Sequence, residues 1–106
     1  MTRDLNPRWS LLARTMGLSQ IESWAELARQ GQLSDDEFQA AKRLKLRDIG
    51  LDADTPLERT NTSPMAQETN LSQANSFGRY VDGGVLTSNE YTLVRRVLLF
   101  ECGMLD

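Results

Sequence analysis

The sequence predicts an all-α protein in which two helical hairpins and an N-terminal helix, joined by a polar linker, pack as a small helical bundle. Three observations predict this fold. Apolar side chains recur at helical spacing, glycines end these apolar runs, and Ser or Thr with Glu three positions later begins the next run. The predicted segments are an N-terminal helix at 1–17, a first hairpin at 18–51, a linker at 52–70 and a second hairpin at 71–106.

The N-terminal helix is predicted from its start signal and its apolar stripe. Asn6 is a suitable N-cap, and Pro7 suits the first helical position, where its missing N–H needs no partner. Gly17 is expected to end the helix. The stripe has the spacing i, i+3, i+4, i+7 and consists of Trp9, Leu12, Ala13 and Met16.

The first hairpin is predicted from paired stop and start signals. A capping box from Ser19 to Glu22 is expected to begin its first helix, which Gly31 ends. A second capping box, from Ser34 to Glu37, begins a helix at about 35–49, and Gly50 with Leu51 forms a Schellman ending. The apolar face of the first helix consists of Ile21, Trp24, Ala25, Leu27 and Ala28.

Between 52 and 70 the composition changes to Thr, Asn, Pro, Glu and Gln without apolar periodicity, which predicts an irregular linker. The second hairpin then has a short helix at about 73–81, weakened by Gly78, and a helix at about 88–102. We expect this last helix to be covered on two sides, because it carries two adjacent apolar stripes. These are Leu93, Val97, Phe100 and Met104 in one stripe and Tyr91, Val94, Leu98 and Cys102 in the other.

The two hairpins look like copies of one another. Segment 84–91 repeats the devices of segment 31–38 at a distance of 53 positions: a glycine, an apolar residue, and a capping box, here from Thr87 to Glu90. Elsewhere identity or chemical character is kept at the same distance, as in Leu18 and Leu71, Ser19 and Ser72, Trp24 and Phe77, and Lys42 and Arg95.

Residues 18–46 resemble the SHOCT (short C-terminal) domain family, and residues 71–99 resemble it more faintly. That family combines a leucine-spaced helix, Gly, an apolar residue, Ser or Thr, and Glu-Phe, followed by Lys and a leucine-rich end. Here these positions hold Leu27, Gly31, Leu33, Ser34, Glu37, Phe38, Lys42 and Leu46. The family's domain usually ends a longer protein, whereas here it is near the N-terminus and doubled. The resemblance implies a helical hairpin used for oligomerisation or partner binding, without catalytic residues.

Composition excludes several classes of site. The 106 residues contain no histidine and one cysteine, Cys102, so one chain has no intramolecular disulfide, no Ser-His or Cys-His catalysis and no credible zinc ligand set. We therefore expect no enzyme activity, cofactor or metal. The longest strongly apolar run, 97–100, is too short to span a bilayer, and we expect a cytoplasmic protein with no membrane partner.

The expected function is protein–protein interaction, as an oligomerisation module, an adaptor or an inhibitor of a larger protein. Hairpins of this size seldom fold alone without metal or disulfide, so they must pack on something else. We place the partner interface on the last helix, and we favour a homodimer over an intramolecular bundle. The interface residues are Leu93, Val97, Leu98, Phe100 and Met104, with polar contacts from Lys42, Arg43, Arg95 and Arg96.

The alternative is a small nucleic-acid-binding regulator. Basic residues at matching positions of the two hairpins could contact phosphates. The net charge of −3 argues against this alternative, because the chain lacks an excess positive field. The residues concerned are Lys42, Arg43, Lys45, Arg47, Arg95 and Arg96.

Overall fold

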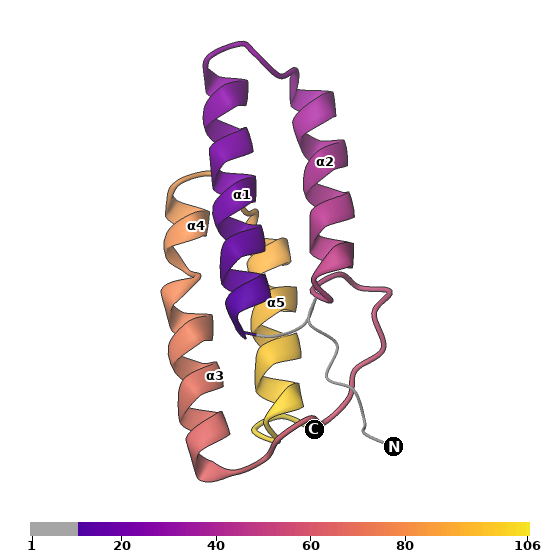
Figure 1. The fold of residues 1–106 in the computed structure, drawn as a ribbon, viewed down its shortest axis with the longest axis vertical. Helices are drawn as coiled ribbons and strands as arrows, with labels where there is room; N and C mark the ends of the chain where they lie inside the picture. The colour runs from indigo at the N-terminus through magenta and orange to yellow at the C-terminus, as the bar shows by residue number, and fades with distance from the viewer. Residues whose placement is uncertain (1–10) are drawn as a thin grey trace. The chain divides into compact units, whose positions relative to one another are not determined.

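The computed structural model describes residues 11–106, in which all regular secondary structure is helical, as predicted. The chain divides into two units, with the boundary between Leu51 and Asp52. Each unit is a helical hairpin: α1 packs on α2, and α3 packs on α5 (Figure 1). The helices are α1 (Leu11–Arg29), α2 (Asp35–Asp48), α3 (Pro64–Ser76), α4 (Arg79–Asp82) and α5 (Ser88–Glu101). The expected N-cap at Asn6 and Pro7, and the stripe residue Trp9, lie outside the described residues.

In the first hairpin α1 runs without interruption from Leu11 to Arg29, so the predicted helix end at Gly17 and the predicted start at Ser19 are wrong. Gly17 is buried in the helix, and a Cβ there would lie 2.9 Å from Cδ1 of Ile49. The close approach of Ile49 to α1 therefore explains this glycine. Ser19 lies in the helix interior, where its carbonyl accepts a hydrogen bond from the Ser23 hydroxyl at 3.3 Å.

The turn between α1 and α2 has the predicted geometry. Gly31 has a φ of 80°, and the Gln32 N–H donates to the Leu27 carbonyl at 2.9 Å, which completes a Schellman ending. Ser34 caps α2: its hydroxyl accepts from the Glu37 N–H at 3.1 Å, and the Glu37 carboxylate accepts from the Ser34 N–H at 2.9 Å. The chain therefore reverses direction with its backbone groups satisfied locally.

The other end of the first hairpin is closed by a long-range polar contact. Arg14 on α1 donates through Nε to the Ile49 carbonyl at 2.9 Å and through Nη2 to the Gly50 carbonyl at 3.2 Å. The Arg14 side chain is buried, and the carbonyls that it caps belong to the predicted Schellman ending of α2. Arg14 thus joins the start of α1 to the end of α2.

The second hairpin begins earlier than predicted, because the last part of the expected linker at 52–70 is helical. Ser63 caps α3, accepting from the Ala66 N–H at 3.1 Å, and Pro64 occupies the first turn. The residues just before this cap contact the end of α5: the Thr60 N–H donates to the Glu101 carbonyl at 2.9 Å, and Arg59 donates to the Leu105 carbonyl at 2.7 Å.

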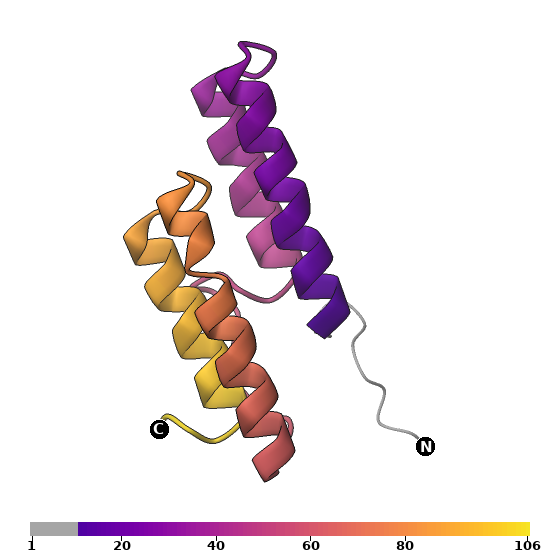
Figure 2. The same cartoon turned by 90° about the vertical axis from the view of Figure 1, so that its left-hand side faces the viewer.

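The helix predicted at 73–81 is in fact two helices, α3 and α4, separated at Phe77 and Gly78 (Figure 2). Across the break the Tyr80 N–H donates to the Phe77 carbonyl at 3.0 Å, and the Val81 N–H donates to the Gly78 carbonyl at 3.1 Å. These bonds span three residues rather than four, so the chain is wound more tightly here. Gly78 also allows the Tyr91 ring to lie close, since a Cβ would be 3.4 Å from its hydroxyl.

The start of α5 has the predicted capping box. The Thr87 hydroxyl accepts from the Glu90 N–H at 3.1 Å, and the Glu90 carboxylate accepts from the Thr87 N–H at 2.8 Å. Gly84, before this cap, and Gly103, after α5, have φ values of 75° and 83°.

Helix boundaries and polar contacts repeat at the distance of 53 residues that the sequence indicated. Both ends of α2 lie 53 residues before the corresponding ends of α5. The contact that closes the hairpin is repeated with different chemistry: Gln67, which corresponds to Arg14, donates to the carbonyl of Cys102 at 3.2 Å, and Cys102 corresponds to Ile49. The repeated unit therefore includes 14–51 and 67–104.

Adjacent glycines in the second hairpin allow a matched test of the turn. Gly84 has a φ of 75°, whereas Gly83 has a φ of −83°. We expect Gly84→Ala to lower the free energy of unfolding by about 1 kcal/mol, because a Cβ is strained in the left-handed region. Gly83→Ala should leave it unchanged or raise it by up to about 1 kcal/mol. Urea denaturation followed by circular dichroism measures both changes, and equal effects of the two substitutions would contradict the assigned turn.

Candidate functional site

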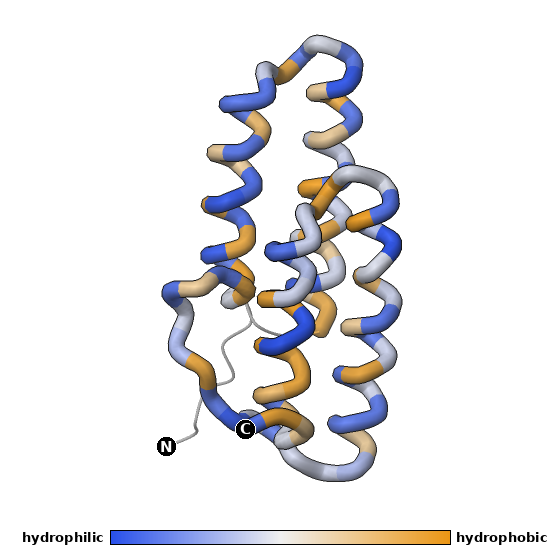
Figure 3. Tube along the Cα trace, turned by 180° about the vertical axis from the view of Figure 1, so that it is seen from behind, coloured by the Kyte–Doolittle hydropathy of each residue, from blue (hydrophilic) through white to orange (hydrophobic). Residues whose placement is uncertain are grey.

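The predicted interface on α5 is largely part of the protein core. Val97 is 2% exposed and Leu98 is 1% exposed, while Leu93 and Phe100 are partly exposed. Met104, beyond the end of α5, is exposed. Figure 3 shows apolar and polar residues mixed along α5, yet this helix has no exposed large apolar side chain. Val97 and Leu98, which the sequence assigned to a partner interface, are thus buried in this structure, and the interface on α5 stays a prediction.

The Phe100 ring is covered by Arg59, a residue of the predicted linker. The guanidinium carbon of Arg59 lies 4.4 Å from the centre of the Phe100 ring, and the same guanidinium donates to the Leu105 carbonyl. A cation over an aromatic face in this geometry contributes about 0.5–1 kcal/mol at an exposed site. The protein's own chain thus covers part of the surface that the sequence assigned to a partner.

The six basic residues of the nucleic-acid alternative are not equally available. Lys42 is 1% exposed, with its ammonium 5.0 Å from the centre of the Phe38 ring. Arg95 donates to the Asn75 side chain at 2.6 Å. Lys45 lies over Trp24, as described below, and the three remaining residues, Arg43, Arg47 and Arg96, are exposed.

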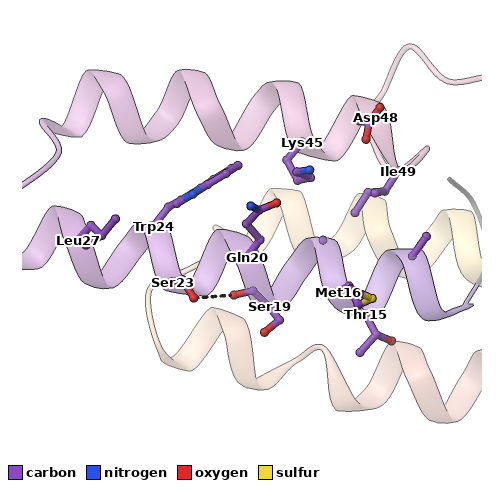
Figure 4. Close-up of a pocket in the computed structure, with 12 residues that line it drawn as sticks. Thr15, Met16, Ser19, Gln20, Ser23, Trp24, Leu27, Lys45, Asp48 and Ile49 are labelled. Atoms are coloured by element: carbon purple, nitrogen blue, oxygen red, sulfur yellow. Dashed lines mark hydrogen bonds between the residues drawn. The ribbon is translucent and has the colours of Figure 1, made fainter.

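An open groove lies in the first hairpin, along α1 and α2 (Figure 4). One stripe of α1 lines it with side chains spaced three or four residues apart, so that they share one side of the helix. Figure 4 shows Trp24 and Gln20 extending from α1 towards α2. The main lining residues are Met16, Gln20, Trp24 and Leu27 from α1 and Lys45, Asp48 and Ile49 from α2.

The groove offers apolar surface to solvent. Met16 is 61% exposed, Leu12 one turn earlier is 67% exposed, and Trp24 and Leu27 are partly exposed. The Lys45 ammonium lies 5.9 Å from the centre of the Trp24 ring, near the outer limit for a cation–π contact. The groove therefore combines an aromatic ring, flexible apolar side chains and a cation.

Beside the groove, Glu26 and Arg29 form an ion pair on the outer side of α1. The hydrogen bond from Arg29, together with its positive charge, lowers the pKa of Glu26, and Gln30 adds a second hydrogen bond. Both side chains are about half exposed, so solvent screens the pair and its contribution to stability is small.

The equivalent face of the second hairpin is buried in part, since Thr69, Ser72 and Ser76, the equivalents of Met16, Ser19 and Ser23, are exposed. Gln73, Phe77, Tyr80 and Leu98 correspond to Gln20, Trp24, Leu27 and Lys45, and all four are buried. We call this surface the groove face in both hairpins. The contrast extends to the preceding position of α2, since Leu44 is 59% exposed whereas its equivalent, Val97, is 2% exposed.

Sequence reasoning assigned Trp24 and Leu27 to an apolar core face and so missed the groove. A signal was present at Lys45, where the second copy has Leu98. A charged residue at the position of a core leucine indicates that the first copy leaves this face open to water.

The groove provides surface for binding. Apolar side chains can bury a partner's apolar groups, and Gln20 can donate and accept hydrogen bonds. Residues 11–106 contain no group of three His, Cys, Asp or Glu side chains arranged to hold a metal ion. In this same part of the chain, every helix is too short or too polar to cross a membrane.

Comparison with protein-family models, with curated proteins and with solved structures finds no match to this chain. The SHOCT resemblance therefore stays a prediction that rests on the residues quoted for it.

The equivalent residues Val97 and Leu44 provide a direct test of which surface is core. Val97→Asp should abolish cooperative unfolding or lower the free energy of unfolding by more than about 3 kcal/mol, because it buries an unpaired charge. Leu44→Asp should change it by less than about 1 kcal/mol, because the side chain is mostly in water. Thermal melting followed by circular dichroism compares the two, and equal destabilisation would contradict the assigned core.

Proposed function

We propose that this protein is a non-enzymatic protein–protein interaction module that binds its partner in the groove of the first hairpin. The observation that carries this proposal is the exposed apolar stripe of α1. Met16 and Leu12 stand mostly in water, and Trp24, about two turns beyond Met16, is partly exposed, although α1 buries its other side. An apolar stripe that residues 11–106 leave uncovered is typical of an interaction surface.

The shape of the groove suits a helical partner. From Met16 to Leu27 the stripe extends for about 16 Å at the helical rise of 1.5 Å per residue, which is about three turns of a second helix. Amphipathic helices bind such surfaces with apolar side chains three or four residues apart. Trp24 is the expected anchor, since tryptophan carries much of the binding energy at many protein interfaces.

The repeated architecture supports the same proposal. Both hairpins are held by short hydrogen-bonded turns, so their side-chain faces are displayed on a fixed frame. The SHOCT resemblance of 18–46 implies oligomerisation or partner binding for a hairpin of this kind, as an adaptor or as an inhibitor.

The positions of the basic residues favour a protein over a nucleic acid as the partner. Lys42 is buried, and Lys45 and Arg95 make contacts within their own hairpins. Within residues 11–106 these contacts leave no continuous row of basic side chains for a phosphate backbone, and the net charge of the chain is −3.

A groove-blocking substitution tests the proposal. Gln20→Arg places a long charged side chain at an exposed position in the groove and should weaken partner binding about tenfold or more, because the charge would be desolvated in the interface. Gln32→Arg makes the same chemical change at an exposed position of the turn, outside the groove, and should bind as the wild type. Quantitative mass spectrometry of proteins that co-purify with each tagged variant measures the difference.

The proposal requires a protein that is retained by the wild type and by Gln32→Arg and lost from Gln20→Arg. The same set of bound proteins from all three, or none from any of them, would contradict it. Circular dichroism of each variant establishes that the hairpins are folded.

A further inference from the structure

The groove of the first hairpin holds a cation between its two helices. Lys45 is partly buried, and its Cδ lies 3.5 Å from the position that a Cβ of Gly17 would take. Its ammonium lies 5.9 Å from the centre of the Trp24 ring. Figure 4 shows the side chain of Lys45 extending from α2 towards α1. The lysine therefore lies inside the groove, with its charge next to the aromatic ring.

Two polar groups of the groove are open to a partner. Lys45 has no carboxylate partner among residues 11–106, and Gln20, which extends towards α2 in Figure 4, makes no hydrogen bond within the same residues. The hydroxyls of Thr15 and Ser23, by contrast, already donate to carbonyls of their own helix, at 2.9 Å and 3.3 Å. The Lys45 ammonium and the Gln20 amide are thus donors that face one another across the groove.

The acidic side chain that lines the groove does not neutralise Lys45. Asp48 lies one turn further along α2, is exposed, and forms no ion pair with Lys45. An exposed charge at the edge of an interface keeps much of its water, whereas a charge beside the anchor loses its water when the partner binds. Because Trp24 is the expected anchor, Lys45 is the charge that a bound partner would desolvate.

We propose that the partner helix carries a carboxylate that pairs with Lys45 and accepts a hydrogen bond from Gln20. The groove is then a site for an acidic amphipathic helix. This inference rests on the proposed function and names the chemistry of its partner. An ammonium that loses its water without gaining an acceptor destabilises a complex strongly. A carboxylate neutralises it and forms stronger hydrogen bonds than an uncharged acceptor does.

The stripe of α1 indicates where this carboxylate lies on the partner. Met16 and Trp24 are separated by about two turns of α1, or about 12 Å at the rise of 1.5 Å per residue, and Gln20 lies between them. A partner helix along this stripe places apolar side chains two turns apart over Met16 and Trp24. The residue one turn from each of them then faces Gln20 and Lys45, and we expect it to be Asp or Glu.

The test selects ligands from a phage-displayed library of helical peptides of about 15 residues, because shorter helices are marginal in water. Two leucines two turns apart are kept constant, and the positions between them are randomised. Selection on the full wild-type chain should enrich Asp and Glu one turn from each leucine. Selection on Lys45→Glu should enrich Lys and Arg at that position instead, because the charge that faces it is reversed.

Two further variants serve as controls. Lys45→Met keeps an unbranched side chain without the charge, and its peptides should show no charge preference at this position. Arg43→Glu makes the same charge change as Lys45→Glu at an exposed position of α2 outside the groove, and it should retain the enrichment of acids. Circular dichroism reports the helicity of every variant, and Lys45→Met replaces Lys45→Glu if the latter loses helicity.

Calorimetric titration then measures the affinity of individual peptides. Those selected on the wild type should bind Lys45→Glu about tenfold or more weakly, because their carboxylate meets a like charge. They should also bind Gln20→Arg about tenfold or more weakly. The arginine fills the groove and adds a second cation beside Lys45, and one carboxylate neutralises only one of the two.

A wild-type selection without acidic enrichment overturns the proposal, and so does the same enriched position from the wild type, Lys45→Glu and Lys45→Met. If such peptides still lose affinity for Gln20→Arg, they bind in the groove and the proposed function stands without its acidic partner. Peptides that bind Gln20→Arg as well as the wild type lie outside the groove and count against both. If no peptide is enriched, the inference fails, and the co-purification experiment decides the proposed function alone.

Discussion

The turn between paired helices is the constraint on which both hairpins depend. A helix of 14 residues, such as α2 or α5, is marginal in water by itself, and its end groups need hydrogen-bond partners. A glycine at positive φ completes the preceding helix, and within a few residues a capping box begins the next, first with Ser34 and Glu37 and again with Thr87 and Glu90. The reversal of the chain is thus specified by contacts that span only a few residues.

At the end opposite the turn, one side chain of the hairpin's first helix donates to backbone carbonyls that directly follow its last helix. Arg14 does this with two donors in the first hairpin, and Gln67 does it with one in the second. The two residues differ in charge and length but satisfy the same backbone position. With both ends fixed by hydrogen bonds, the side chains on the two faces can change without altering the backbone of the hairpin.

The faces have indeed diverged in character while the frame has stayed constant. Lys45 and Leu98 occupy the same position of the repeat, one beside an open groove and the other in the core. Trp24 and Phe77 differ in the same way, since one aromatic ring is partly in water and the other is buried. One scaffold thus buries these positions in one copy and leaves them partly in water in the other, which is the basis of the proposed function.

The sequence by itself determined the all-α class, the two turns, their capping boxes and the ends of α2 and α5, because these depend on hydrogen bonds between residues close in sequence. The prediction from sequence was wrong where a residue is explained by a contact with another residue far along the chain. A glycine such as Gly17 is typical of helix ends. Here the glycine is needed because Ile49, at the end of α2, packs too closely for a Cβ. Ser63 and Pro64 are a typical helix start, but the polar composition around them favoured the prediction of a linker.

Only the tertiary structure decided which apolar faces are covered. Val97 and Leu98 belong to a helix that the sequence made apolar on two sides, and the fold buries both of them, while Met16 and Trp24 line a groove. Helical periodicity shows which side chains are apolar and would gain free energy from burial. Whether it does so depends on residues far along the chain that come to lie over it, and no local pattern encodes their positions.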